Sequence, residues 1–225
     1  MKLVCDGRIS PVKSLNTHLI SITVCLVLVF CPDQAIAADQ ARKVEAVERK
    51  AEALEQKAVS SDGNTLPAAT KIITKPEAQT IDPDGEKPLD DALTCLARTI
   101  YWEARGEETA GMQAIANVVM NRLTHEDFSD TICDVVTQGQ EQGACQFSWW
   151  CDGRSDDAEA EKSYSLAKEI ARKALNQQLR DKTDGALYFH HHAVTPDWGS
   201  EFIKTTKIGE HIFYKPRAVS SDTRD

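Results

Sequence analysis

Three features are scarce or missing in this 225-residue sequence, and each absence argues against a class of protein. Positive charge is in deficit, because 26 Lys and Arg face 35 Asp and Glu, for a formal net charge of -9. Binding to phosphate backbones needs a basic patch, so a nucleic-acid partner is not expected. No Cys-x-x-Cys pair occurs among the seven cysteines, which argues against a structural zinc site. No apolar run reaches the roughly 20 residues that a membrane-spanning helix needs.

The longest apolar run lies near the N-terminus and is typical of an export signal. Basic residues precede the run over residues 19–30 (LISITVCLVLVF), and Ala35-Ile36-Ala37 matches the small-x-small cleavage pattern. We therefore predict a signal peptide over residues 1–37 and an exported protein, either periplasmic or secreted. Two alternatives stay open. One is a lipoprotein signal ending at Cys31, and the other is an uncleaved inner-membrane anchor.

Export decides how the remaining cysteines are interpreted. Cleavage after residue 37 would leave four of them: Cys95, Cys133, Cys145 and Cys151. An even number in an oxidising compartment predicts two disulfides. Four cysteines allow three pairings, and the sequence does not choose among them.

A tether is predicted between the signal and the folded domain. In residues 38–58, apolar side chains recur at alternating spacings of three and four: Val44, Val47, Ala51, Leu54 and Ala58. This pattern fits a short coiled coil capable of weak self-association or partner contact, or else a solvated, partly helical segment. Residues 59–88 contain four prolines and no sustained periodicity, which predicts a flexible linker. A disordered tail is expected over residues 216–225.

The folded domain is expected over residues 89–215, with helices first and strands last. Helical periodicity predicts a helix that is capped by Asp90 or Asp91 and stopped by Gly106. Further helices are predicted over 110–123, with Thr109 as cap, over 130–136 and over 157–178. The long segment 138–155 is predicted as a loop. Strands are predicted over 186–190, 202–207 and 211–214, so the fold class is α+β with a small antiparallel sheet.

One carboxyl group, that of Glu103, stands out on the first of these helices. It lies beside the apolar stripe and in the last turn, where partial burial and the negative end of the helix dipole both raise a carboxyl pKa. A raised Glu pKa is what a general acid needs near neutral pH. The helical wheel alone favours an ordinary boundary residue paired with Arg98 or Arg105. Glu107 is interpreted as structural.

Several motif blocks closely resemble the SleB/CwlJ-type cell wall hydrolase family. They occur in the family's order over about 120 residues: LARTIYWEARGE from residue 96, GMQAIANVVMNR from 111, CQFS from 145, GALYFH from 185, Pro196 with Trp198, and IGEHIFY from 208. A single E-A-R-G-E would be weak support, whereas ordered blocks are specific. The resemblance implies a small lysozyme-like domain that cleaves peptidoglycan glycan strands. It also implies that the first Glu of E-A-R-G-E, here Glu103, is the catalytic acid.

The resemblance further implies a lytic transglycosylase, which needs one carboxyl group and forms an anhydromuramoyl end. Glycosidases that hydrolyse ordinarily need two carboxylates, and Asp152 is the candidate for a second one. A hydrolase that uses Glu103 with Asp152 therefore stays open, as does a non-catalytic peptidoglycan-binding module. No cofactor is predicted.

Substrate contacts are predicted in the loop and on the first strand. Gln146 and Ser148 can hydrogen-bond sugar substituents, and Phe147 and Trp149 offer ring faces to sugars or form a disulfide-stapled core. Tyr188 and His190 are expected beside the cleft. Strand alternation places His190 and His192 on one face, a spacing that could share an ion, but no metal is predicted because no partnering carboxylate motif accompanies them. His211 is interpreted as structural.

Overall fold

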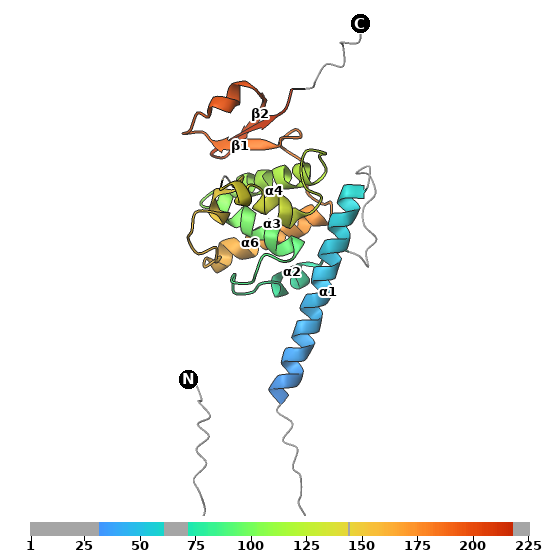
Figure 1. Ribbon diagram of the computed structural model, residues 1–225. Coiled ribbons are helices and arrows are strands. Elements are labelled where there is room, and N and C mark those ends of the chain that lie inside the picture. The colour runs from blue at the N-terminus through green and yellow to red at the C-terminus, as the bar shows by residue number, and fades with distance from the viewer. Residues whose placement is uncertain (1–31, 61–71, 144, 218–225) are drawn as a thin grey trace, which may run out of the picture.

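The computed structural model describes residues 32–60, 72–143 and 145–217, which form a helical layer with a small sheet at one end (Figure 1). The helices are α1 (Pro32–Ser60), α2 (Lys75–Thr80), α3 (Ala92–Glu103), α4 (Thr109–Leu123), α5 (Ile132–Thr137) and α6 (Glu161–Leu175). The strands are β1 (Tyr188–His191), β2 (Ile203–Ile208) and β3 (His211–Lys215). Short 3-10 helices cover Gln140–Gln142, Ser148–Trp150 and Asp197–Ser200. The predicted α+β class is confirmed.

Helix α3 is the centre of the fold and determines where Glu103 lies. The Asp91 side chain caps the helix by accepting a hydrogen bond of 2.9 Å from the Thr94 N–H. Every residue from Ala92 to Tyr101 is buried, because α1, α4, α5 and α6 all pack around this helix. The helix ends at Glu103, and Gly106 adopts the left-handed conformation (φ +85°) that turns the chain away. Within α3, only Trp102 and Glu103 in the last turn are partly exposed.

The sheet is antiparallel with the order β1-β3-β2 and sits against the end of α4 (Figure 1). Two neighbouring α4 side chains tie the chain entering β1 to this helix. Asn121 Nδ2 donates to the carbonyl oxygen of Ala186 at 3.0 Å, and Arg122 Nε donates to that of Leu187 at 2.7 Å. Helix α4 starts after Glu108, which makes no side-chain cap, so the predicted capping role of Thr109 is wrong.

Helix α1 confirms the helical prediction for residues 38–58, but its apolar seam is not free. Val47, Ala51, Leu54 and Ala58 are buried in the same core as α3. The residues that a coiled coil would pair with another chain are thus already packed inside this one. The N-terminal part of α1 is exposed and runs past the domain (Figure 1). None of the helices in the described part of the chain is long and apolar enough to cross a membrane.

The prediction of a flexible linker over residues 59–88 is wrong for residues 72–88, which the structure describes. Residues 61–71 lie outside the described residues, but Ile73 and Ile81 are fully buried, and α2 begins with a capping box formed by Thr74 and Glu77. Asp82 accepts hydrogen bonds from buried Arg98, at 2.8 and 3.0 Å, and from the Tyr164 hydroxyl at 2.6 Å. This segment is therefore a strap that completes the core. The prediction of a linker rested on the prolines of this segment. Prolines restrict the local backbone but do not indicate which distant residues the segment contacts.

The ends of the chain are described only in part. The predicted signal peptide lies outside the described residues up to residue 31, and residues 32–37 begin α1. Of the predicted tail, residues 218–225 lie outside the described part, whereas Arg217 donates to the carbonyl oxygens of Ser200 and Glu201.

Both predicted disulfides are present, and the structure selects their pairing. Cys95 of α3 is bonded to Cys133 of α5, and Cys145 is bonded to Cys151. The first bridge joins two core helices. The second closes a short loop that carries Gln146 and Ser148.

Candidate active site

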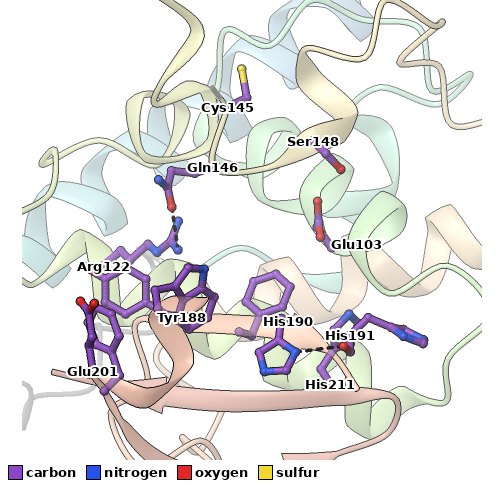
Figure 2. Close-up of a pocket in the computed structure, with 13 residues that line it drawn as sticks. Glu103, Arg122, Cys145, Gln146, Ser148, Tyr188, His190, His191, Glu201 and His211 are labelled. Atoms are coloured by element: carbon purple, nitrogen blue, oxygen red, sulfur yellow. Dashed lines mark hydrogen bonds between the residues drawn. The ribbon is translucent and has the colours of Figure 1, made fainter. Parts of the chain in front are cut away.

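A groove of about 650 Å³ opens between the end of α3, the disulfide-closed loop and the sheet. Glu103 reaches it from α3 and Arg122 from α4, while Gln146 and Ser148 approach from the loop on the opposite side to Tyr188 (Figure 2). The strand side adds further aromatic and ionisable residues: Phe189, His190, His191, Trp198, Glu201, Phe202 and His211. Segments far apart in the sequence therefore form a single cleft around Glu103.

The Glu103 carboxyl group has the properties of a general acid. Its side chain is half-buried, and removal from water raises its pKa to about 7, against an opposing effect of the Arg122 charge. No hydrogen bond from the described residues holds the carboxyl group. A carboxyl group with this pKa holds its proton for much of the time near neutral pH and can donate it to a ligand in the groove.

Arg122 is the functional candidate that the sequence analysis missed. It is 3% exposed and lies among the rings of Phe128, Phe147 and Tyr188, at 5.1, 5.1 and 5.7 Å from their centroids. Burial lowers its pKa to about 10 despite the neighbouring Tyr188 and Glu103. A signal existed in the sequence, because Arg122 falls three and four residues after the core residues Val119 and Val118. A charged side chain on a buried helix face costs folding free energy, so its presence indicates a functional or structural role.

Loop residues predicted to bind substrate divide into two groups. Gln146 and Ser148 line the groove, and their contact with substrate stays a prediction. Phe147 is fully buried under Arg122 and beside Phe189, so its predicted contact with sugar rings is wrong. Trp149 is 5% exposed and contributes to the wall of an adjoining pocket rather than to this groove. Phe147 therefore follows the alternative interpretation, in which the ring packs in the core beneath the disulfide-closed loop.

Strand residues Tyr188 and His190 both line the groove, as predicted. The Tyr188 ring lies 4.5 Å from that of Phe202 and beside Arg122. His190 has both ring nitrogens engaged: Nδ1 lies 2.9 Å from the His191 carbonyl oxygen, and Nε2 lies 3.0 Å from the Tyr214 hydroxyl. A carbonyl only accepts, so Nδ1 carries the proton and Nε2 accepts from Tyr214. His190 therefore offers the groove a ring surface rather than a free donor.

Glu107 and His211 form a buried pair at the edge of the groove. Nδ1 of His211 lies 2.6 Å from Oε1 of Glu107, and both side chains are less than 10% exposed. A Cβ at Gly111 or Gly209 would collide with this carboxylate, which explains why glycine stands at both positions. Burial lowers the pKa of His211 against the opposing effect of Glu107. The pair joins the loop after α3 to the start of β3, in agreement with the structural role predicted for both residues.

The histidine cluster differs from the pair that strand alternation suggested. His191, His192 and Glu210, rather than His190 with His192, place one potential metal ligand each within 4.8 Å of one another. His191 Nδ1 accepts the Ala193 N–H at 3.2 Å, so in the neutral ring the other nitrogen carries the proton. His192 Nδ1 lies 2.8 Å from the Glu210 carboxylate. These contacts fit a hydrogen-bonded surface cluster better than a preformed metal site.

A second pocket of about 280 Å³ adjoins the groove on the other side of Ser148. Glu103 and Ser148 line both cavities, so the carboxyl group stands at their junction. The second pocket also contains Trp102, Arg105 and Asp152. A chain-like ligand could extend through both cavities past Glu103.

Comparison with known proteins finds similar cell wall hydrolases. A family model described as Cell Wall Hydrolase matches residues 106–214 and thus begins three residues after Glu103. The spore cortex-lytic enzyme of Bacillus cereus is 32% identical over 136 residues, which are 59% of this chain and 47% of that enzyme. The spore cortex-lytic enzyme of Halalkalibacterium halodurans is 30% identical over 148 residues, or 61% of this chain and 41% of the relative. The chain spans less than half the length of these curated relatives.

Two solved structures are also similar. One is the catalytic domain of the Bacillus cereus SleB protein, at 30% identity over 55% of this chain and 89% of that domain, with a TM-score of 0.45. The other is the catalytic domain of the germination-specific lytic transglycosylase SleB from Bacillus anthracis, at 30% identity over 59% of this chain and 99% of that domain, also with a TM-score of 0.45. The family match and the identity to the spore cortex-lytic enzymes confirm the resemblance carried by the motif blocks: residues 106–214 match the cell wall hydrolase family.

Proposed function

We propose that the protein is a peptidoglycan lytic transglycosylase that cleaves the bond between N-acetylmuramic acid and N-acetylglucosamine, with Glu103 as its catalytic acid. The observation that carries this proposal is the Glu103 carboxyl group itself. It is desolvated, its pKa is raised to about 7, and Glu103 lines two adjoining cavities. The relatives are named spore cortex-lytic enzymes, which agrees with a glycan substrate.

The proposed reaction uses the Glu103 carboxyl group twice. It first protonates the glycosidic oxygen, which leaves with the bonding electron pair as the C1–O bond breaks. The resulting carboxylate then takes the proton from the C6 hydroxyl of the muramoyl sugar, and the C6 oxygen bonds to C1. The products are a free sugar hydroxyl and a 1,6-anhydromuramoyl end, and Glu103 is protonated again. Because the nucleophile is tethered to the reacting sugar, proximity replaces a second carboxylate.

A hydrolase is the second candidate, and the position of Asp152 favours it. Asp152 lines the same pocket as Glu103, with one carboxylate oxygen accepting the Arg154 N–H at 2.9 Å. Glu201, on the strand side of the main groove, is a further carboxylate in reach of a bound glycan. Either group could activate water in place of the C6 hydroxyl.

Export is part of the proposal, because peptidoglycan lies outside the cytoplasmic membrane. The two disulfides support it, since such bonds persist in oxidising compartments. The predicted signal segment, which ends within α1 at residue 37, supports it as well.

Product analysis separates the candidates. Purified sacculi are digested with the parent protein and with the Glu103→Gln, Asp152→Asn and Glu201→Gln variants, and the soluble fragments are analysed by mass spectrometry. We expect anhydromuramoyl ends from the parent, no fragments from Glu103→Gln, and unchanged products from the other two variants. Hydrated ends that disappear in Asp152→Asn or Glu201→Gln would establish hydrolysis instead. Undiminished digestion by Glu103→Gln would reject the proposed acid.

A further inference from the structure

Arg122 has unused hydrogen-bonding capacity at a point where a ligand would lie. Its guanidinium group lines the groove on which Glu103 also opens (Figure 2). Nε is satisfied by the Leu187 carbonyl oxygen, but Nη1 is buried and has no partner among the described residues. Nη2 makes one long contact of 3.4 Å to Gln146 Oε1. A buried cation with unmet donors costs free energy unless something binds to them.

The neighbouring Gln146 makes the recognition pattern more specific. Its Oε1 is an acceptor that lies beside the Arg122 donors, and both groups face the groove (Figure 2). A donor next to an acceptor matches a secondary amide, which offers one C=O and one N–H. A carboxylate would leave the Gln146 acceptor without a proton to receive. The rings of Tyr188 and Phe202 line the same groove and provide an apolar wall for a methyl group.

From this arrangement we infer that Arg122 and Gln146 form a subsite for the N-acetyl group of a sugar, with Arg122 donating to the acetyl oxygen and Gln146 accepting from the amide N–H. The inference rests on the proposed function, because it assigns a substituent of the same glycan substrate. Such a subsite makes the protein selective for N-acetylated strands. A glucosamine residue without its acetyl group would lack the acceptor oxygen, and its ammonium group would face the Arg122 cation.

Binding can be tested separately from catalysis. The full chain carrying Glu103→Gln is titrated with tri-N-acetylchitotriose and with the glucosamine trimer, and binding is followed by calorimetry or NMR. We expect the acetylated trimer to bind roughly 10- to 100-fold more tightly, the range for hydrogen bonds to a charged group. Adding Arg122→Gln should remove this preference, whereas Arg49→Gln, an exposed arginine on α1, should retain it.

Arg122 is also part of the core, so the Arg122→Gln variant needs a folding control. Its unfolding midpoint is measured first, and Gln146→Leu provides a second test, because it removes the acceptor and leaves the Arg122–Leu187 bond in place. Gln146→Leu should weaken binding of the acetylated trimer and leave the glucosamine trimer unaffected. If both variants still prefer the acetylated trimer, the subsite is overturned. It is also overturned if the Glu103→Gln protein binds the two trimers equally or binds neither. Arg122-dependent binding seen only with a muramic acid-containing dimer would assign the lactyl arm instead and overturn the acetyl assignment.

Digestion of sacculi distinguishes failure of this subsite from failure of the proposed function. If the parent protein releases fragments equally from N-acetylated and de-N-acetylated sacculi, the subsite is rejected and the glycan-cleaving function stands. If it releases none from either and the Glu103→Gln protein still prefers the acetylated trimer, the proposed reaction fails and the subsite stands.

Discussion

At the scale of single residues, the burial that raises the pKa of Glu103, the proposed catalytic acid, also lowers the stability of the folded protein. The same removal from water that keeps its proton in place near neutral pH makes its ionised form unfavourable in the folded protein. Arg122 opposes this effect from across the groove without forming a hydrogen bond to the carboxyl group. Desolvation and the Arg122 charge together set the pKa of Glu103 and thus the pH range in which its carboxyl group is protonated.

The pH dependence of activity follows from this balance. The proposed reaction requires the acid form of Glu103, whose pKa is about 7. We expect kcat/KM on soluble glycan fragments to be nearly constant below that pH. Above it, kcat/KM should fall about tenfold per pH unit, as for a single required proton. The measurement is a pH–rate profile, and a profile that rises through pH 8 would show that the required form of the enzyme is deprotonated.

Stability should respond to the Glu103→Gln substitution in a pH-dependent way. The folded-state pKa of about 7 lies above the ordinary value of 4.5, so Glu103 costs no stability below pH 4.5, and the cost grows as the pH rises from 4.5 and is complete above pH 7. Gln carries no charge. The variant should therefore match the parent near pH 4 and exceed it by about 2 kcal/mol at pH 8 in urea unfolding. Equal stability of the two proteins at pH 8 would contradict the desolvation of this carboxyl group.

At the scale of elements, the two disulfides have different roles, one in stability and one in the shape of the site. Cys95–Cys133 joins α3 to α5 across 38 residues, whereas Cys145–Cys151 closes only six residues, those that position Gln146 and Ser148 at the groove. Loop-closure entropy favours the longer bridge as a stabiliser, at about 4 against about 2 kcal/mol. The shorter bridge shapes the site.

Replacing each cysteine pair by alanines should therefore give opposite patterns. Cys95→Ala with Cys133→Ala should lower Tm strongly and leave kcat/KM nearly unchanged at a temperature where the protein is folded. Cys145→Ala with Cys151→Ala should lower Tm less and reduce kcat/KM by at least about tenfold, because misplaced binding groups slow the reaction. Thermal unfolding and glycan digestion of both double variants provide the comparison, with each variant serving as the control for the other. The same pattern in both variants would contradict this division.

At the scale of the whole molecule, the stable unit extends beyond the family match. The residues N-terminal to α3 complete the core, with Leu54 and Ile81 buried and Asp82 holding the fully buried Arg98. Hydrogen bonds from Tyr164, the Lys87 N–H and Arg98 lower the pKa of Asp82 in spite of its burial. The matched region from 106 to 214 therefore depends on partners that precede it.

Shortening the chain tests this extension. A chain trimmed to residues 89–215 should be less stable than residues 32–217 by at least about 3 to 5 kcal/mol, because Arg98 would keep its buried charge without Asp82. A chain of residues 72–217 keeps Asp82 and loses only α1, so it should be intermediate. Urea unfolding of the three proteins ranks them. Equal stability of the shortest and longest chains would show that the strap and α1 are dispensable.

Local patterns in the sequence determined much of this protein. The apolar stripe and a cap at Asp90 or Asp91 predicted α3, the strand-forming segments 186–190, 202–207 and 211–214 predicted the sheet, and the ordered motif blocks pointed to the family and to Glu103. Each of these rests on residues within a few positions of one another, where spacing translates directly into shared faces.

Only the tertiary structure decided which distant residues meet. It buried Phe147, brought Arg122 to the groove, paired the cysteines and folded the proline-containing strap onto Arg98 and Tyr164. Such contacts join residues far apart in the sequence, as between Asp82 and Tyr164, which are 82 positions apart. Periodicity along the chain carries no information about them, because burial and charge pairing depend on how whole elements pack.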